Sequence, residues 1–242
     1  MAIEQILCVT SFDVDSSGYA RPSALMHWMQ ELAGEDLAQF GLTYPMMRQR
    51  GYVFVLFAMK LQIQSPMRAG DEYLLKSYSV GTHGATFTRD FYFISRGRTV
   101  ATASTKWVLL DFKERKILHP SRLDAPLQHF PEMTAGINVS KRLDTSLTEK
   151  TDLRRVYPSM LDENNHLNNC VYADLTTDYL PPAPDRFVSE LEILFTHEAA
   201  LHEELEIRKE QKDDGVTIYA HNLSRDLPCF SARAVTSPIS KE

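Results

Sequence analysis

Hydrophobic positions along the first half of the chain predict one helix followed by an antiparallel sheet. Residues 5–14 alternate as a strand and lead into a polar turn. Residues 22–40 carry apolar side chains at helical spacing, with Pro22 suited to the first turn and Gly41 to the stop. After a loop come four runs rich in β-branched and aromatic residues, at residues 52–64, 72–80, 85–95 and 99–111. A long helix before such a meander is typical of an α+β layer fold.

The same order of elements starts again after residue 150. Residues 126–150 lack periodicity and contain prolines and polar spacers, which is typical of a linker. A strand-like run at residues 154–159 then leads to a polar turn at 162–169 and a helix at 169–179. Four more strands are predicted at residues 187–195, 203–211, 216–223 and 229–236.

The two halves match each other when they are aligned, which indicates an internal duplication. Residues 61–75 share their apolar spacing with residues 191–207. The pattern Asp-x-Ser-x-Tyr at residues 15–19 takes the place of Asp-x-Asn-x-His at residues 162–166. The sequence therefore predicts two fused helix-plus-sheet units and a linker between them, over residues 1–125, 151–242 and 126–150 respectively.

Composition and charge exclude several classes of protein. The 242 residues carry a formal net charge of −6, whereas a nucleic-acid-binding domain normally presents a basic field. The longest apolar run, residues 52–59, is far short of the roughly 20 residues that cross a bilayer. The first residues lack the basic start and apolar core of a signal peptide. Cys8, Cys170 and Cys229 are odd in number and match no metal-ligand spacing, which indicates a reducing, cytoplasmic compartment.

The polar turn before the second helix holds the candidate chemistry. Asp162, Asn164 and His166 stand at alternate positions, so their side chains face one small volume if the segment is extended. Asn168 or Asn169 is a natural N-cap for the helix that follows. The backbone N–H groups at a helix start can stabilise a developing oxyanion. The turn therefore combines an acid, a carboxamide and an imidazole with an anion-binding helix end.

Two plainer interpretations of this turn stay open at this point. Asn- and Asp-rich turns are common before helices because these residues cap and turn well. A metal site is the other alternative. The spacing of the nearby histidines, His197 and His202, from His166 matches no known metal-ligand motif, however.

The turn resembles the active-site signature of the acyl-acyl-carrier-protein (acyl-ACP) thioesterases, the plant plastid enzymes and their bacterial relatives. The pattern D-x-N-x-H-x-N-N-x-x-Y is met at every position of residues 162–172. The Glu of the family's downstream Glu-Cys pair is met by Glu198, whereas Ala199 stands in place of the Cys. In the first half, LMHWMQELAGEDLAQFGL resembles the first helix with its Q-E pair, and STKWVLLDFKERKILHPS resembles a strand carrying Trp107. The resemblance covers residues 5–236. Because no transit-peptide pattern precedes these residues, the chain resembles a bacterial member of the family.

The resemblance implies two fused hot-dog domains, with the catalytic groups in the second. Glu198 or Asp162 would accept a proton from the water that attacks the thioester, and His166 would orient that water or transfer protons. Asn164 would hold the water or the carbonyl oxygen. No metal or organic cofactor is implied. The missing cysteine argues against a cysteine nucleophile, so the two cysteines of the second half are interpreted as packing residues.

The resemblance also implies the partners of the reaction. The family binds the fatty acyl chain in its first domain, where the candidates are Leu25, Met26, Met29, Met59, Leu61, Phe87 and Phe91, with plain core packing as the alternative for each. The chain would be delivered by an acidic acyl carrier protein. Five basic residues form a candidate landing surface for that protein, with plain solvated charge as the alternative; they are Lys141, Arg142, Lys150, Arg154 and Arg155. No nucleic acid and no membrane insertion is expected, and monomer and homodimer are both open.

Three rival functions remain. A thioesterase of the same fold could act on coenzyme A esters, in which case a nucleotide pocket is expected. A hot-dog dehydratase also pairs a histidine with a carboxylate but lacks the D-x-N-x-H-x-N-N run. A non-catalytic acyl-binding module would have no use for all four candidate groups.

Overall fold

The computed structural model describes residues 3–239 apart from residues 126, 182 and 184, so the linker boundary predicted at residue 126 lies outside the described part. The helices are α1 (Pro22–Ala38), α2 (Tyr44–Gln49) and α3 (Asn169–Thr177). The strands of the first half are β1 (Ile3–Cys8), β2 (Tyr52–Ile63), β3 (Glu72–His83), β4 (Thr86–Ser95), β5 (Arg98–Asp111) and β6 (Ile117–Leu118). Those of the second half are β7 (Glu149–Arg155), β8 (Arg186–Phe195), β9 (Glu204–Lys212), β10 (Gly215–Asn222) and β11 (Leu227–Pro238).

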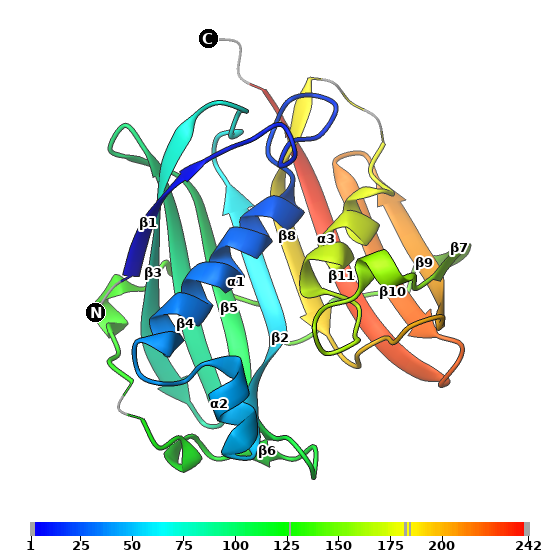
Figure 1. The fold of residues 1–242 in the computed structure, drawn as a ribbon. Helices are drawn as coiled ribbons and strands as arrows, with labels where there is room; N and C mark the ends of the chain where they lie inside the picture. Colours follow the sequence, from blue (N-terminus) through cyan, green and yellow to red (C-terminus); the bar gives the residue numbers. More distant parts are fainter. Residues whose placement is uncertain (1–2, 126, 182, 184, 240–242) are drawn as a thin grey trace.

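These strands form a single antiparallel sheet that wraps around the helices (Figure 1). Its order is β1-β3-β4-β5-β2-β8-β11-β10-β9-β7, with β6 beside β5. The two halves meet at β2 and β8, where Lys60 lies opposite Glu192. The Lys60 ammonium lies 3.6 Å from the Glu192 carboxylate, which is 3 % exposed, and 3.0 Å from Glu190. The predicted α+β architecture of two fused hot-dog units is confirmed, with their sheets joined edge to edge inside one chain.

Backbone hydrogen bonds repeat between the halves, as an internal duplication predicts. Val9 accepts a bond from the N–H of Gly70 at 2.8 Å, and Val156 accepts one from the N–H of His202 at 2.9 Å. Gly70 and His202 both have a left-handed backbone, with φ of 86° and 65°. Non-glycine residues adopt this conformation uncommonly, so its presence at His202 shows that the turn keeps one shape in both halves.

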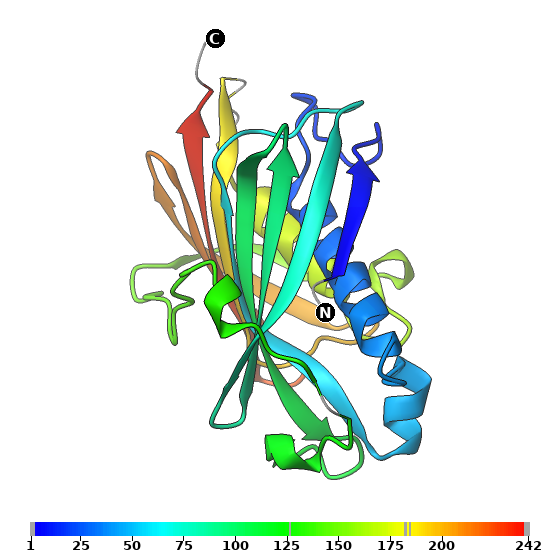
Figure 2. The ribbon, with the colours of Figure 1, turned by 90° about the vertical axis from the view of Figure 1, so that its left-hand side faces the viewer.

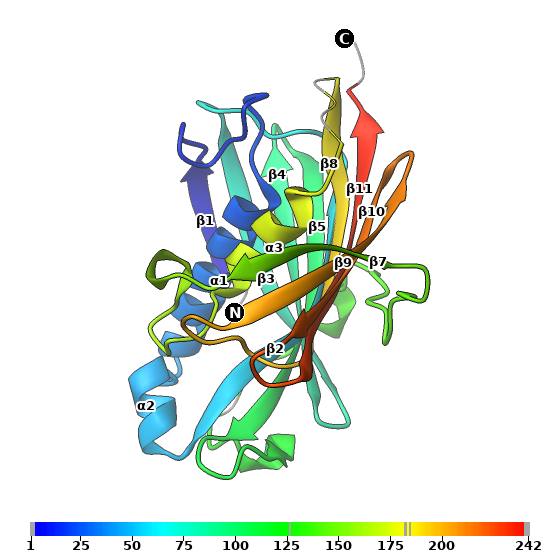
Figure 3. The same cartoon turned by 90° about the vertical axis from the view of Figure 1, so that its right-hand side faces the viewer.

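Helices α1 and α3 lie side by side on the inner face of the sheet (Figures 1 and 3). Pro22 begins α1, and the apolar stripe of that helix is buried through Leu25, Met26, Met29, Leu32 and Ala33. One hydrophobic core continues across both halves and includes Leu61 of β2 and Leu191 of β8. None of the described helices is long and apolar enough to span a membrane.

Local hydrogen bonding moves several element boundaries away from the sequence expectation. Strand β1 ends at Cys8 rather than near residue 14, because the Asp13 carboxylate captures the amide of Thr10 at 2.8 Å and its hydroxyl at 2.5 Å. The predicted strand at 154–159 is displaced to Glu149–Arg155, and Pro158 then begins a 3₁₀ turn. Helix α3 has nine residues and ends at Thr177, two residues early. The predicted loop before β2 contains α2.

The segment between the halves is fastened to the outer face of the sheet (Figure 2). The buried carboxylate of Asp90 accepts the backbone N–H of Ala135 at 2.8 Å. The buried carboxylate of Glu192 accepts the N–H of Ser140 at 2.5 Å. Buried carboxylates are stable only when they are hydrogen-bonded or paired, so these bonds hold the segment in place. The predicted linker thus covers the sheet instead of running free, and its last two residues belong to β7.

Candidate active site

The polar turn before α3 is held together by the Asp162 carboxylate. Its Oδ1 accepts the backbone N–H of Asn164 at 2.8 Å and that of His166 at 3.0 Å. The N–H of Asp162 in turn donates to the His166 carbonyl at 2.8 Å. All three residues are half-buried. Three hydrogen bonds therefore gather the acid, carboxamide and imidazole residues in the turn that was predicted to hold the candidate chemistry.

The first half contains the same turn without the imidazole. Asp15 Oδ1 accepts the N–H of Ser17 at 2.8 Å and that of Tyr19 at 3.3 Å, as Asp162 does in the second half. Tyr19 thereby occupies the position of His166. Because the carboxylate makes the same bonds in both copies, its role in shaping the turn is independent of any catalytic chemistry.

Asn168 is the N-cap of α3, as the sequence predicted. Its side-chain Oδ1 accepts the N–H of Cys170 at 2.9 Å, and its carbonyl accepts that of Val171 at 2.9 Å. Two of the helix-start amides are therefore already bonded, and the helix end offers fewer donors to an oxyanion than the sequence suggested. Asn169 donates from Nδ2 to Gln30 Oε1 on α1 at 3.1 Å, which fixes the start of α3 against the first half.

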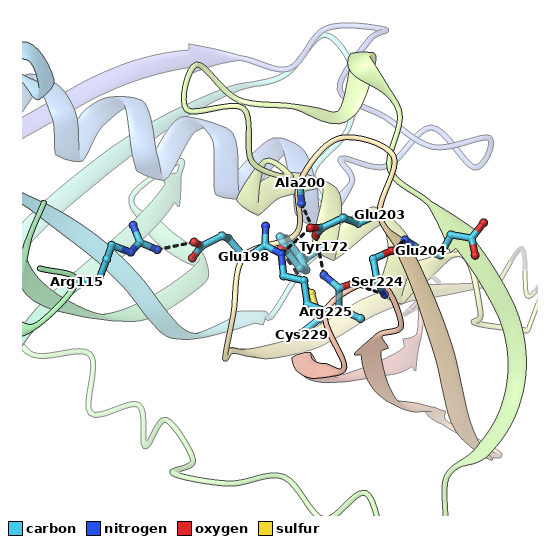
Figure 4. Close-up of polar contacts among 10 residues, drawn as sticks. Arg115, Tyr172, Glu198, Ala200, Glu203, Glu204, Ser224, Arg225 and Cys229 are labelled. Carbon is cyan, nitrogen blue, oxygen red and sulfur yellow. Dashed lines mark hydrogen bonds and ion pairs between the residues drawn. The ribbon is translucent and has the colours of Figure 1, made fainter. Parts of the chain in front are cut away.

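Glu198 lies on the segment that pairs with the motif turn. His166 forms a β-bridge with Ala200, and the Leu167 amide donates to the Ala199 carbonyl at 2.7 Å. The Glu198 carboxylate accepts a bond from Arg115 Nη2 at 2.5 Å (Figure 4). Arg115 follows β5 in the first half, in the hairpin that leads to β6. An ion pair between the halves thus orients the carboxylate that the sequence singled out.

A second side chain of the first half reaches Asn164. The hydroxyl of Tyr44, on α2, donates to Asn164 Oδ1. Burial raises the pKa of Tyr44, and the neighbouring Glu163 and Asp162 carboxylates raise it further, whereas Arg115 lowers it. Tyr44 therefore remains a protonated donor near neutral pH. Because Arg115 and Asp162 both act on Tyr44, the ion pair at Glu198 and the motif turn lie in one neighbourhood.

A small apolar cavity lies between α1 and the sheet. Four of the seven residues predicted to bind the acyl chain, Met26, Met29, Met59 and Phe91, line it. The other lining residues are Gln30, Leu56, Thr105 and Trp107. Gln30 also contacts Cys170, with Nε2 3.1 Å from Sγ, so the cavity ends next to the start of α3. Leu25 and Leu61 are buried in the main core without lining the cavity, and Phe87 packs in a separate cluster under α2 with Leu42, Met47, Tyr52 and Leu109.

The cysteines of the second half are poorly suited to act as nucleophiles. Burial raises the pKa of the Cys170 thiol to about 12 and that of Cys229 to about 11. Only the thiolate is a strong nucleophile, and almost none forms near neutral pH. Cys229 packs 3.8 Å from the Tyr172 hydroxyl, whose pKa burial also raises. Ala199, at the family's cysteine position, is fully buried.

Glu203 supports the segment that carries Glu198. Its carboxylate accepts the N–H of Ala200 at 2.8 Å, Asn222 Nδ2 at 2.7 Å and Arg225 Nε at 2.5 Å (Figure 4). Burial would raise the pKa of Glu203, but these three donors outweigh it and the pKa lies below its ordinary value. An ionised Glu203 therefore closes the turn that pairs with His166.

The structure gives no support to the metal alternative. Within the residues described, no three or more His, Cys, Asp or Glu side chains are grouped so as to hold a metal ion. His197 Nδ1 donates instead to the Pro228 carbonyl at 2.8 Å, on the exposed side of the segment.

Sequence reasoning missed the contributions of Tyr44, Arg115 and Glu203 to this site. For Tyr44 a signal was present, because Thr43-Tyr44-Pro45 places a proline in the first turn of a short helix. Arg115 and Glu203 carry no local signal, since their partners are 83 and up to 22 residues away in sequence.

Comparison with known proteins shows which family model and which solved structures this chain resembles. Residues 4–121 match the sequence model of the acyl-ACP thioesterase N-terminal domain. No curated protein matches the chain by sequence. An acyl-ACP thioesterase from Bacteroides thetaiotaomicron has the same fold, with a TM-score of 0.87, 15 % identity and coverage of 98 % of both chains. The 12:0-ACP thioesterase from Umbellularia californica superposes with a TM-score of 0.79 at 15 % identity, over 98 % of this chain and 97 % of the other.

Both superpositions extend over the two halves and therefore confirm the double hot-dog fold of the whole chain. The family match lies in the half that supplies the cavity, Tyr44 and Arg115. The resemblance to the acyl-ACP thioesterases is thus confirmed, and residues 4–121 of this double hot-dog protein match the N-terminal domain of that family.

Proposed function

We propose that this protein hydrolyses the thioester of fatty acyl-ACP and releases the free fatty acid. This proposal rests on one observation: residues of both halves contact each other at one site, where Tyr44 bonds to Asn164 and Arg115 to Glu198. The first half belongs to an acyl-ACP thioesterase domain and contributes an apolar cavity, while the second contributes the turn with Asp162, Asn164 and His166. A thioesterase needs both an apolar slot and polar groups at its end.

Glu198 is the base in this mechanism. The Asp162 Oδ1 is occupied by two backbone N–H groups, and Asp15 makes the same bonds in the half that lacks a histidine. We therefore assign Asp162 to holding the turn and Glu198 to accepting the proton of the attacking water. His166 then orients the water or passes the proton to the departing thiolate, a task for which imidazole is suited near neutral pH.

Asn164 positions the carbonyl oxygen of the thioester or the water. Its Oδ1 is held by the Tyr44 hydroxyl, which leaves the Nδ2 amide as the donor that can face the substrate. The Nδ2 lies 3.5 Å from Asp162 Oδ2, a weak contact that a substrate oxygen could replace. Tyr44 thus orients the Asn164 carboxamide so that its Nδ2 group faces the substrate.

Two alternatives are weighed against this function. An acyl-CoA thioesterase of the same fold would use the same groups on a nucleotide-bearing substrate. A non-catalytic acyl-binding module would have no reason to keep Glu198 ion-paired beside the histidine turn. We place the enzyme in the cytoplasm, where acyl carrier proteins and reduced cysteines are found together.

The test is hydrolysis of acyl-ACP substrates of graded chain length by the purified protein. We expect release of free fatty acid without added metal and in the presence of a chelator. Activity that a chelator abolishes and zinc restores would contradict this mechanism. Hydrolysis of acyl-CoA with no activity on acyl-ACP would favour the first alternative, and ligand binding without turnover the second.

Filling the cavity is expected to change chain-length preference. Met29 is 2 % exposed and lines the cavity beside α1, so Met29→Trp should shorten the acyl chain that is hydrolysed fastest. Phe87→Trp is the matched control, since Phe87 is also buried, at 6 % exposed, but packs in the separate cluster under α2. The measurement is kcat/KM over a chain-length series. A shift of equal size in both variants would contradict the assignment of the cavity.

A further inference from the structure

The surface beside the site is basic, although the whole chain is acidic. Residues 44–50 and 111–124, which comprise α2 and the hairpin of β6, contain six Lys or Arg and three Asp or Glu, against a formal net charge of −6 for the chain. We call the six exposed side chains the α2–hairpin surface; they are Arg48, Arg50, Lys113, Arg115, Lys116 and Arg122. Figures 1 and 3 show α2 at one end of the sheet, apart from β7.

Ion pairs compensate only part of that charge. Arg115 is paired with Glu198 at 2.5 Å, whereas Arg48, Lys113 and Arg122 form no ion pair with a described acidic residue. Asp111 accepts the backbone N–H groups of Lys113 and Glu114 at 2.9 and 2.8 Å. Asp124 neutralises Arg50, at 2.9 Å. Lys116 meets Glu114 only loosely, at 3.4 Å, where both side chains are largely exposed and the interaction is weak. The surface therefore presents a positive field to solvent.

The α2–hairpin surface adjoins the candidate catalytic groups directly. Its Arg115 contacts Glu198, and Arg48 stacks 4.4 Å above the ring of Phe112, which joins α2 to the hairpin. Tyr44, one turn before Arg48, donates to Asn164. A macromolecule bound on this surface can therefore present a flexible thioester arm to the site. Met46 and Ile117 add exposed apolar contacts within the same two segments.

Two of the five basic residues that the sequence singled out, Lys150 and Arg154, are less suited to this role. Arg154 forms ion pairs within the chain, with Asp152 at 3.0 Å and Asp178 at 3.4 Å, and Lys150 pairs with Glu206 at 2.7 Å. They lie on β7, at the far edge of the sheet from the first half. Their charge is largely compensated, so the long-range field that guides a partner is weaker there.

We propose that the α2–hairpin surface is the docking site of the acidic acyl carrier protein. This inference rests on the proposed function and adds the location of the partner. Complementary surface charge speeds encounter and fixes orientation more than it adds affinity, which is suited to a carrier that must leave after each turnover. The same charge acts little on a small neutral thioester, so the two substrates separate docking from chemistry.

The test is the double variant Lys113→Glu/Lys116→Glu, assayed with acyl-ACP and with a neutral acyl-N-acetylcysteamine thioester. We expect KM for acyl-ACP to rise about tenfold, which is the order of effect expected when complementary charge pairs at the exposed edge of an interface are lost. The kcat for acyl-ACP and the kcat/KM for the small thioester should stay within a factor of two or so. The rise should fade as salt approaches 1 M, where the Debye length is about 3 Å.

The matched control is Arg98→Glu/Arg208→Glu, which makes the same change in net charge at two exposed positions elsewhere. Arg98 begins β5, about 40 Å from the hairpin at about 3.3 Å per residue, and Arg208 lies on β9, beside the edge strand β7 of the second half. An equal rise in KM with the control would overturn the docking site, as would no rise with the test variant. If the test variant raised KM for acyl-CoA but not for acyl-ACP, the surface would be assigned to binding nucleotide phosphates instead. Failure of the wild type on acyl-ACP would refute the proposed function itself.

Discussion

His166→Ala and Glu198→Ala are each expected to lower kcat on acyl-ACP by about 10²–10⁴, the range for loss of a general acid or base. The physical reason is that water is a poor nucleophile unless a positioned group removes its proton. Glu198 is placed for this by the Arg115 ion pair, and His166 by the Asp162 turn. The measurement is single-turnover release of fatty acid, which separates the chemical step from product release.

Cys170→Ser and Cys229→Ser are the controls for this pair. Both thiols are held protonated by burial, so kcat should change by less than about threefold once folded protein is counted, well below the loss of an acid–base group. If a cysteine substitution removed activity and Glu198→Ala did not, attack by water assisted by a carboxylate would be the wrong mechanism.

Asp162→Ala is expected to remove activity, whereas Asp15→Ala is expected to leave it unchanged. Each substitution deletes the same two hydrogen bonds to backbone N–H groups of a turn. Both should therefore lower the free energy of unfolding by a similar amount, about 0.5–2 kcal/mol if these bonds resemble helix caps. Only Asp162 holds a turn that carries a histidine, so only its loss should lower kcat, by about 10² or more, as expected when an acid–base group is misplaced.

The duplication thus supplies an internal control for stability. Chemical denaturation gives the free energy of unfolding of both variants, and kcat is compared for the folded fraction. One active centre per chain is expected in a titration with a tight product analogue, because Tyr19 replaces His166 in the first half. Loss of kcat in folded Asp15→Ala, or two equivalent centres in the titration, would refute the single-site interpretation.

The sequence determined the order of elements and the chemistry of the motif because both depend on neighbouring residues. Period-two alternation located β2–β5 and β8–β11 to within a few residues, since strand side chains alternate between two faces. The Asp162 turn and the Asn168 cap were predictable for the same reason: their hydrogen bonds span at most four residues. The duplication was visible because equal turns need equal residues, such as Asp15 and Asp162.

Short elements without a repeating pattern were harder to predict. Helix α2 has six residues, too few to display helical periodicity, and β7 is an edge strand with a largely exposed, polar sequence. The segment between the halves has the composition of a free linker. Buried Asp90 and Glu192, distant in sequence, fasten it to the sheet.

Only the tertiary structure decided how the halves share one site. The pairing of Lys60 with Glu192 joins the sheets, and that geometry brings Tyr44 to Asn164 and Arg115 to Glu198. These contacts span 120 and 83 residues of sequence. Phe87 and Met29 are both large, apolar and buried, and only the packing of α1 against the sheet places one of them on the cavity. Contacts of this kind follow from how whole elements pack, and no local pattern of residues encodes them.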